Sequence, residues 1–205
     1  MDESKVKYSI IIPAHNADGH IVPALKSIRS QSFTDYELIV VCDSCTDQTE
    51  WIAGTVYGAR TAKVDYHLDG LTRNAGIDMA RGEWILFLDD DDWWLHEYVL
   101  EELDKIVTER SGSMDVLFFS FIWKGVGYTR QTPERNYAAV WSKCWRRAFI
   151  GKTRFKDTPY WSDLEFNRTL LQKRPRAVFW DFPIVYYNYL REGSISWRKE
   201  QGEIE

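Results

Sequence analysis

The first half of the chain alternates short apolar runs with segments in which apolar residues recur at helical spacing. The runs 8–13, 37–42 and 84–88 are rich in Ile, Val and Leu, which is typical of strands buried on both faces of a sheet. The segments between them keep the spacing of amphipathic helices. The predicted helices cover 21–28, 46–58, 71–81 and 95–106, with a shorter strand at 63–67 and Gly82 at the C′ position of the third helix.

The pattern changes after residue 112. The later segments predict a strand over 115–123, a polar connection over 124–137, a short helix over 141–150, a helix over 162–172 and an aromatic strand over 177–189. We find no linker that would separate two domains. We therefore expect a single domain over 1–205, in which the second half completes the sheet and forms the second wall of a cleft.

Strand–helix–strand repetition with apolar strands predicts an α/β protein with a mostly parallel sheet and helices on both faces. Such sheets bind ligands at the carboxyl ends of their strands. The three clearest strand ends read PAHN at 13–16, DS at 43–44 and DDDD at 89–92. All three are polar and two are acidic, so this edge of the sheet is where we expect the functional site.

Composition and charge narrow the function. With 44% apolar and 28% charged residues, the chain is not a disordered one, and its net charge of −5 gives no overall basic footprint for nucleic acid. Residues 141–200 nevertheless carry 13 basic and 6 acidic side chains, a local charge of +7. This excess fits a solvated basic face, and equally a surface that meets something anionic.

Localisation follows from what the sequence lacks. No apolar run approaches the ~20 residues of a membrane span, and the charged N-terminus has no apolar signal region. Three cysteines cannot form a disulfide framework, and the pair Cys42-x-x-Cys45 has no second ligand pair for zinc. We expect a reduced, cytoplasmic protein, and peripheral association with a membrane stays open.

The acidic run 89–92 is the strongest chemical signal. In an extended segment Asp89 and Asp91 point to the same side and Asp90 points elsewhere. A hard divalent cation such as Mg²⁺ or Mn²⁺ would offset the cost of these carboxylates, bound through one or two of them together with substrate phosphates. The alternative is a solvated acidic loop that caps the next helix.

The other strand ends fit a nucleotide. Asp43 or Asn16 can pair with a base or ribose edge, and Arg73 can neutralise a pyrophosphate. The sequence has neither the P-loop pattern nor a G-x-G-x-x-G after the first strand, which excludes a P-loop and argues against a dinucleotide fold.

Four segments in order give the chain its resemblance to a known family. They are SIIIPAHN, ELIVVCDSCTDQT, GLTRNAGIDMARGEWILFLDDDDWW and YWSDLEFNRTLL. Together they resemble the family-two inverting glycosyltransferases, whose fold is the Rossmann-like GT-A fold. The resemblance implies a nucleotide-sugar donor-binding half over 1–112 and an acceptor-binding, catalytic-base half over 113–205.

The resemblance assigns roles to the polar residues at the strand ends. Pro13, His15 and Asn16 match the loop that touches the nucleotide base, Asp43 matches the acidic residue that contacts the base, and Arg73 matches the arginine beside the donor. Asp89, Asp90 and Asp91 match the DXD element, with Asp91 as the main metal ligand and Asp89 or Asp90 serving the ribose and the metal waters. Cys42 and Cys45 stand where the family has Asp and Ser.

The catalytic base implied by the resemblance is Asp163. The family's preceding Glu is Ser162 here, which leaves Glu165 in reserve. An N-cap role for Ser162 or Asp163 is the alternative. Arg191 and Ser194 fall in a segment that resembles one that closes over the diphosphate. Five tryptophans near these motifs are either core residues or sugar-stacking platforms; they are Trp93, Trp94, Trp141, Trp145 and Trp161.

The function implied is metal-dependent, inverting transfer of a sugar from a nucleotide diphosphosugar, with a UDP-sugar as the favoured donor. The expected acceptor is a hydroxyl of a glycan or polysaccharide. Two alternatives remain: the same fold acting on an anionic acceptor, such as modified nucleic acid or a teichoic-type polymer, and a non-catalytic module that binds a sugar nucleotide or a glycan.

Overall fold

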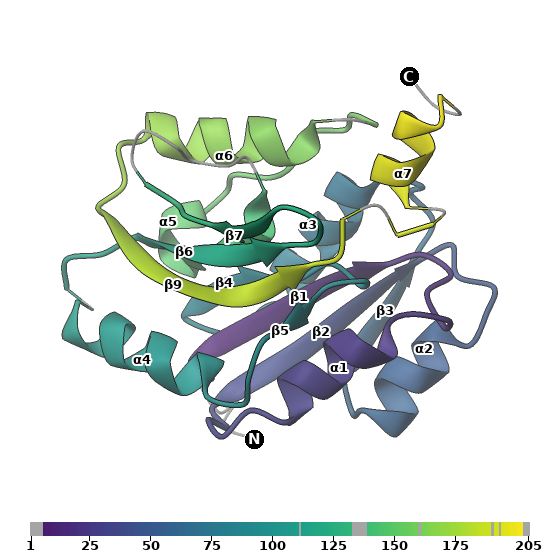
Figure 1. Ribbon diagram of the computed structural model, residues 1–205, viewed down its shortest axis with the longest axis horizontal. Helices are drawn as coiled ribbons and strands as arrows, with labels where there is room; N and C mark the ends of the chain where they lie inside the picture. Colours follow the sequence, from purple (N-terminus) through teal and green to yellow (C-terminus); the bar gives the residue numbers. More distant parts are fainter. Residues whose placement is uncertain are drawn as a thin grey trace.

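One mixed sheet organises the protein. The computed structural model describes residues 6–110, 112–132, 139–159, 161–189, 191–192 and 194–202. Within these residues the sheet has nine strands in the order β3-β2-β1-β4-β8-β6-β9-β5, and β7 pairs with β6 (Figure 1). The predicted α/β class is confirmed. Residues 133–138 of the predicted polar connection lie outside the described residues.

The first half of the sheet is parallel, as the apolar runs predict. Its strands are β1 (Tyr8–Ala14), β2 (Tyr36–Asp43), β3 (Arg60–Val64) and β4 (Trp84–Phe87). β1 lies between β2 and β4, with Tyr8 opposite both Tyr36 and Trp84. Every residue of β1 and β4 is buried, because helices cover both faces. The carboxyl ends of these strands therefore open at one edge.

The second half of the sheet is mixed. β8 (Lys143–Arg146) runs antiparallel to β4 and to β6 (Val116–Trp123). β9 (Ala177–Tyr187) is parallel to β6, whereas β5 (Trp93–Trp94) and β7 (Gly127–Thr129) pair antiparallel with β9 and β6. "Mostly parallel" thus describes only the first half.

The prediction of a helix over 141–150 is wrong for residues 143–146, which form a strand. The whole segment is a 3₁₀ turn (Val140–Ser142), the strand β8 and the four-residue helix α5 (Arg147–Ile150). β8 fills the position between two strands that are distant in the sequence, β4 and β6. Pairing on both sides outweighs a helical pattern that was short to begin with.

Helices cover both faces, as predicted. α1 (Val22–Arg29), α2 (Thr49–Trp51) and α4 (Val99–Glu109) lie below the sheet in Figure 1, and α3 (Asp69–Met79), α5 and α6 (Ser162–Gln172) lie above it. Two apolar clusters match these faces. The helix predicted over 46–58 is α2 followed by a π-helical turn (Ile52–Val56). A short helix, α7 (Ile195–Glu200), lies near the chain's end.

Two glycines allow close packing against β1. A Cβ on Gly82 would lie 2.5 Å from the Ser9 backbone nitrogen, and a Cβ on Gly76 would lie 2.3 Å from Ile11 Cγ2. The prediction of Gly82 as a C′ residue is wrong, since α3 already ends at Met79. Gly82 is needed for the approach of its backbone to β1, where its N–H donates to Ser9 Oγ at 2.8 Å.

Candidate active site

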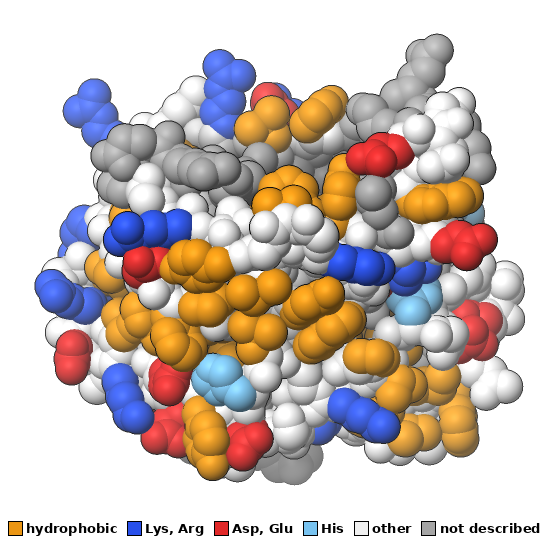
Figure 2. Space-filling view, in the orientation of Figure 1, with side chains coloured by type: hydrophobic (Ala, Val, Ile, Leu, Met, Phe, Trp, Pro, Cys, Tyr) orange, Lys and Arg blue, Asp and Glu red, His pale blue; other side chains and the backbone are white. Residues whose placement is uncertain are grey.

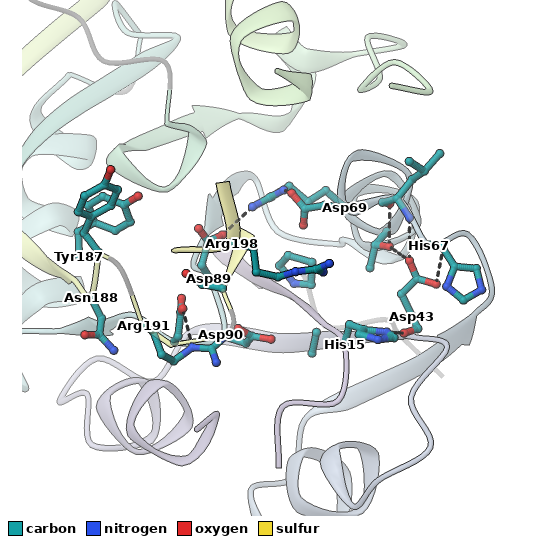
Figure 3. Close-up of a pocket in the computed structure, with 18 residues that line it drawn as sticks. His15, Asp43, His67, Asp69, Asp89, Asp90, Tyr187, Asn188, Arg191 and Arg198 are labelled. Atoms are coloured by element: carbon teal, nitrogen blue, oxygen red, sulfur yellow. Dashed lines mark hydrogen bonds and ion pairs between the residues drawn. The ribbon is translucent and has the colours of Figure 1, made fainter. Parts of the chain in front are cut away.

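A cleft of about 440 Å³ opens at the carboxyl ends of β1, β2 and β4. The end of β9 and the segment after it form the opposite wall (Figure 3). The residues that line the cleft are Pro13, Ala14, His15, Asp43, His67, Leu68, Asp69, Thr72, Arg73, Asp89, Asp90, Asp91, Tyr187, Asn188, Tyr189, Arg191, Ser194 and Arg198. Six of the residues predicted for the donor thus line one cavity with Asp91.

His15 has a defined tautomer at one end of the cleft. Its Nδ1 lies 2.6 Å from the Asp43 carbonyl oxygen, and a carbonyl only accepts, so Nδ1 carries the proton. Nε2 then accepts from the Asn16 amide at 3.3 Å. The His67 ring stands edge-on at a centroid distance of 6.4 Å. His67 carries no signal in the sequence motifs, and only the fold brings it beside His15.

Asp43 is buried, and its carboxylate is largely used within the protein. It accepts from the backbone N–H groups of residues 66–68 at 2.8–3.1 Å and from the hydroxyls of Thr72 (2.8 Å) and Ser44 (3.0 Å). Burial works to raise the pKa of the Asp43 carboxyl, but these hydrogen bonds outweigh it and lower the pKa. Asp43 therefore holds the 66–68 turn that forms this wall.

Asn16 lies just outside the lining. Its Oδ1 accepts from the Thr46 N–H at 2.9 Å, which ties the loop after β1 to the loop after β2. Asn16, Ser44 and His67 all have positive φ, at 47°, 53° and 52°. Left-handed backbone at three neighbouring non-glycine positions is costly and is commonly found at ligand sites.

Three aspartates line the acidic corner, and each has a basic partner from a different part of the chain. Arg73 Nη2 donates to Asp89 Oδ1 at 2.6 Å, and Arg191 Nε donates to Asp91 Oδ2 at 2.8 Å. His20 Nε2 lies 3.2 Å from Asp90 Oδ1. Asp90 thus faces the cleft as well, because the segment turns instead of extending, with the Asp92 N–H bonded to the Asp89 carbonyl.

The electrostatics of this corner fit a cation. Burial raises the pKa of the Asp89 carboxyl, and the nearby carboxylates of Asp163, Asp91 and Asp90 raise it further against the lowering effect of Arg73. The pKa of Asp91 is also raised by burial and by Asp90. Among the described residues no group of three His, Cys, Asp or Glu side chains has metal-binding geometry, so a cation would need oxygens from a bound phosphate to complete its coordination.

Arg73 links the acidic corner to helix α6 in the second half of the chain. Its side chain is 3% exposed and forms ion pairs with Asp69, one turn earlier on α3, and with Asp89. Its Nη1 lies 3.5 Å from Asp163 Oδ1, and its guanidinium lies 5.9 Å from the Phe155 ring centroid. One buried cation therefore lies beside the carboxylates of both Asp89 and Asp163.

Asp163 lies in the first turn of α6 and is not among the residues that line the cleft. Its Oδ2 accepts from the Val140 N–H at 3.2 Å, and its side chain is 26% exposed. The helix N-cap is Trp161, with no side-chain capping bond, so the N-cap alternative for Asp163 and Ser162 is wrong. Glu165 is half-buried and paired with Lys156.

The tryptophans divide by burial. Trp94, Trp141 and Trp145 are buried in the core. Trp93 stacks on Tyr186 with centroids 4.5 Å apart, in the region of β5 and β9 where Figure 2 shows a band of hydrophobic side chains. Trp161, directly before α6, is 67% exposed. The sequence could not separate these cases because the five residues share one chemistry.

The comparison with family models decides the family. The model described as glycosyl transferase family 2 matches residues 9–173. The chain belongs to this family. It is 31% identical over 146 residues to the Escherichia coli UDP-Glc:alpha-D-GlcNAc-diphosphoundecaprenol beta-1,3-glucosyltransferase WfaP, covering 66% of this chain and 56% of that protein. It is 33% identical over 129 residues to the Staphylococcus aureus poly(ribitol-phosphate) beta-N-acetylglucosaminyltransferase TarS, covering 59% of this chain and 22% of that protein.

Solved structures support the GT-A fold. Residues 1–349 of TarS in complex with UDP-GlcNAc superpose with a TM-score of 0.81 at 24% identity, over 92% of this chain and 60% of that one. The Pyrobaculum calidifontis mannosyltransferase PcManGT, in complex with GDP-Man and Mn²⁺, gives 0.72 at 16% identity, over 98% of this chain and 62% of that one. The family-2 chain described here spans little more than half the length of WfaP and less of TarS. In its described part no helix is long and apolar enough to cross a bilayer.

Proposed function

We propose that this chain is a metal-dependent, inverting glycosyltransferase that uses a UDP-sugar and an acceptor hydroxyl of a glycan or polysaccharide. The observation that carries the proposal is that Asp89 and Asp91 line the cleft at the strand ends together with Arg73, whose Nη1 also lies 3.5 Å from Asp163 Oδ1. The names of WfaP and TarS and the TarS complex with UDP-GlcNAc support the donor class.

Asp91 and Asp89 are the residues that would hold the metal. Each keeps one carboxylate oxygen on an arginine, and their crowding favours an added positive charge. A bound Mn²⁺ or Mg²⁺ would supply neutralisation of the negative charge that develops on the leaving diphosphate. The Mn²⁺ in the PcManGT complex supports this assignment.

The chain's own groups account for the remaining steps. Arg73 contributes a fixed, desolvated positive charge beside the diphosphate. Asp163 takes the proton from the acceptor hydroxyl. The hydroxyl oxygen meanwhile attacks the anomeric carbon on the side opposite the leaving group, and this attack inverts the configuration of that carbon. Pro13, His15 and Asn16 bound the base site, with Asp43 holding its wall, and Asp89 or Asp90 serves the ribose. Arg191 and Ser194 approach the diphosphate from the opposite wall.

Donor binding tests the proposal directly. UDP should raise the melting temperature in the presence of Mn²⁺ by more than UDP or Mn²⁺ alone, because ligands that bind only the native state stabilise it. Asp91→Ala should lose this Mn²⁺-dependent part. Asp78→Ala, which removes an exposed carboxylate from α3, should keep it. An equal Mn²⁺-dependent response from the parent and Asp91→Ala would contradict the metal assignment. Binding of UDP without any hydrolysis of UDP-glucose or UDP-N-acetylglucosamine would favour a non-catalytic module.

An anionic acceptor is a second candidate. The local charge of +7 over 141–200 favours it, and TarS, by its name, acts on poly(ribitol-phosphate). Phosphate contacts release counterions, so binding of such a polymer should weaken steeply and linearly on a log–log plot against salt concentration. A salt-independent affinity would exclude this acceptor class and leave the neutral glycan.

A further inference from the structure

Lys143 is a buried lysine that the reaction steps above leave without a role. It is the first residue of β8, and its side chain is fully buried. Its Nζ lies 5.2 Å from the Phe118 ring centroid on the neighbouring strand. Burial lowers the pKa of the Lys143 amine to about 7, against the opposing effect of Asp163. Burying an amine in such surroundings lowers the free energy of unfolding unless the amine is hydrogen-bonded. The hydrogen-bond partners of Lys143 therefore indicate what the residue does.

The contacts of Lys143 lead to Asp163 through one peptide group. Lys143 Nζ donates to the Ala139 carbonyl at 2.7 Å, and Ser142 Oγ donates to the same oxygen at 3.0 Å. The Val140 N–H, on the other side of the same planar peptide, donates to Asp163 Oδ2 at 3.2 Å. Donors on the carbonyl polarise the peptide and strengthen its N–H as a donor.

We propose that Lys143 is a positioning residue for Asp163, acting through the Ala139–Val140 peptide group. The proposal rests on the proposed role of Asp163 as the base. Arg73 Nη1 lies 3.5 Å from Oδ1, and the peptide N–H holds Oδ2. The carboxylate is thus oriented from α3 on one side and from the 140–142 turn on the other, and Lys143 fixes that turn.

The charges around the carboxylate define what Lys143 adds. Asp163 interacts with Arg73 of α3, with Asp89 after β4 and with Lys143 of β8. Arg73 also pairs with Asp89 and Asp69, so its charge is shared. Removing Lys143 takes away a positive charge from the β8 side and the strongest donor to the Ala139 carbonyl.

The test compares Lys143→Met with Arg146→Met. Methionine keeps the unbranched chain and its packing, while Arg146→Met removes a cation of the same strand that pairs with Glu83 away from the site. The assay is Mn²⁺-dependent hydrolysis of whichever donor the parent hydrolyses, UDP-glucose or UDP-N-acetylglucosamine. Lys143→Met should lower kcat about 10- to 100-fold, the range expected when a catalytic group is misplaced. Its KM should stay within about twofold, and the acidic limb of its kcat profile should move to higher pH.

Arg146→Met should keep the parent's kcat and pH profile. In an Asp163→Asn background, Lys143→Met should change kcat by less than about twofold, because residues that act as a unit are not additive. Parent-like kcat and pH profile in Lys143→Met, or a full further loss in the Asp163→Asn background, would overturn the positioning role. If Lys143→Met does not fold, Lys143→Gln takes its place, and an unmoved acidic limb overturns the inference in the same way. An inactive parent, or an active Asp163→Asn, would instead refute the proposed function beneath it.

Discussion

At the scale of single residues, the Asp163 carboxylate has two possible roles, as a catalytic base or as a residue that stabilises α6. Its two oxygens have different partners, the Val140 N–H and the Arg73 guanidinium, so the side chain is held without being a helix cap. A residue that only stabilised α6 would contribute through the helix dipole, which is worth a fraction of a kcal/mol to about 1 kcal/mol. The two roles therefore predict different results for the same substitution.

Asp163→Asn should lower kcat for transfer or donor hydrolysis by at least ~10²-fold, the usual contribution of a general base. Its affinity for UDP should stay close to the parent's, because the amide keeps the shape of the side chain. Its melting temperature should fall by only a few degrees, because the NH2 group then faces either the Val140 N–H or the Arg73 guanidinium. Steady-state kinetics and thermal melts measure both. Glu165→Gln is the matched control on the same helix turn and should stay active. A fully active Asp163→Asn would send the search for the base elsewhere.

The buried Lys143 gives a pH-dependent stability. Its pKa is about 7 in the folded protein and about 10.4 in an unfolded chain. Between these values the unfolded state binds the extra proton, so the parent gains stability as the pH rises. Relative to the parent, Lys143→Met should therefore be most stable at pH 7 and below, and should lose a few kcal/mol of that relative stability by pH 10. Urea unfolding at several pH values measures the difference, and a pH-independent gap would show that the amine is not buried as described.

At the scale of elements, the loops and helices at the cleft depend on close contacts with β1. Gly82 joins α3 to β4 and leaves no room for a side chain beside Ser9. The sequence predicts a structural role for Gly82, but as the C′ residue of the preceding helix. A glycine after a helix is equally compatible with close approach of its backbone to a neighbouring strand. Only the position of β1, far back in the sequence, separates the two.

Gly82→Ala should destabilise the protein by about 1–3 kcal/mol, the range for overpacking a tight site, because the added methyl group meets backbone atoms that cannot rotate away. Denaturant unfolding gives the value. Gly112→Ala, where a Cβ meets nothing within 4 Å, should change stability by no more than about 0.5 kcal/mol. Similar effects of the two substitutions would contradict the packing described here.

At the scale of the whole molecule, the two halves differed in how well the sequence predicted them. β1, β2 and β4 are buried along almost their whole length and carry continuous apolar runs, so each was predicted within a residue or two. β8 and β5 are four and two residues long, too short to carry a period. They exist because neighbouring strands supply their hydrogen bonds.

The site follows the same division. His15, Asp43 and Asp89 follow strands with strong local signals, and the structure brings them to one cleft. His67, Asn188 and Arg198 line the same cleft but sit in segments whose local pattern marks no site. The β9 wall reaches the acidic corner through pairs about a hundred residues apart, such as Arg191 with Asp91, and no local pattern contains such a pairing.

The contact of Gly76 with Ile11 has a consequence for sequence divergence. The missing side chain at Gly76 lets α3 sit against β1, and Arg73 lies one turn earlier on that helix. A larger residue at 76 would lift the helix and draw the guanidinium away from Asp89. Positions 11 and 76 are therefore expected to covary among homologues that keep the arginine, with any side chain gained at 76 matched by a smaller one at 11.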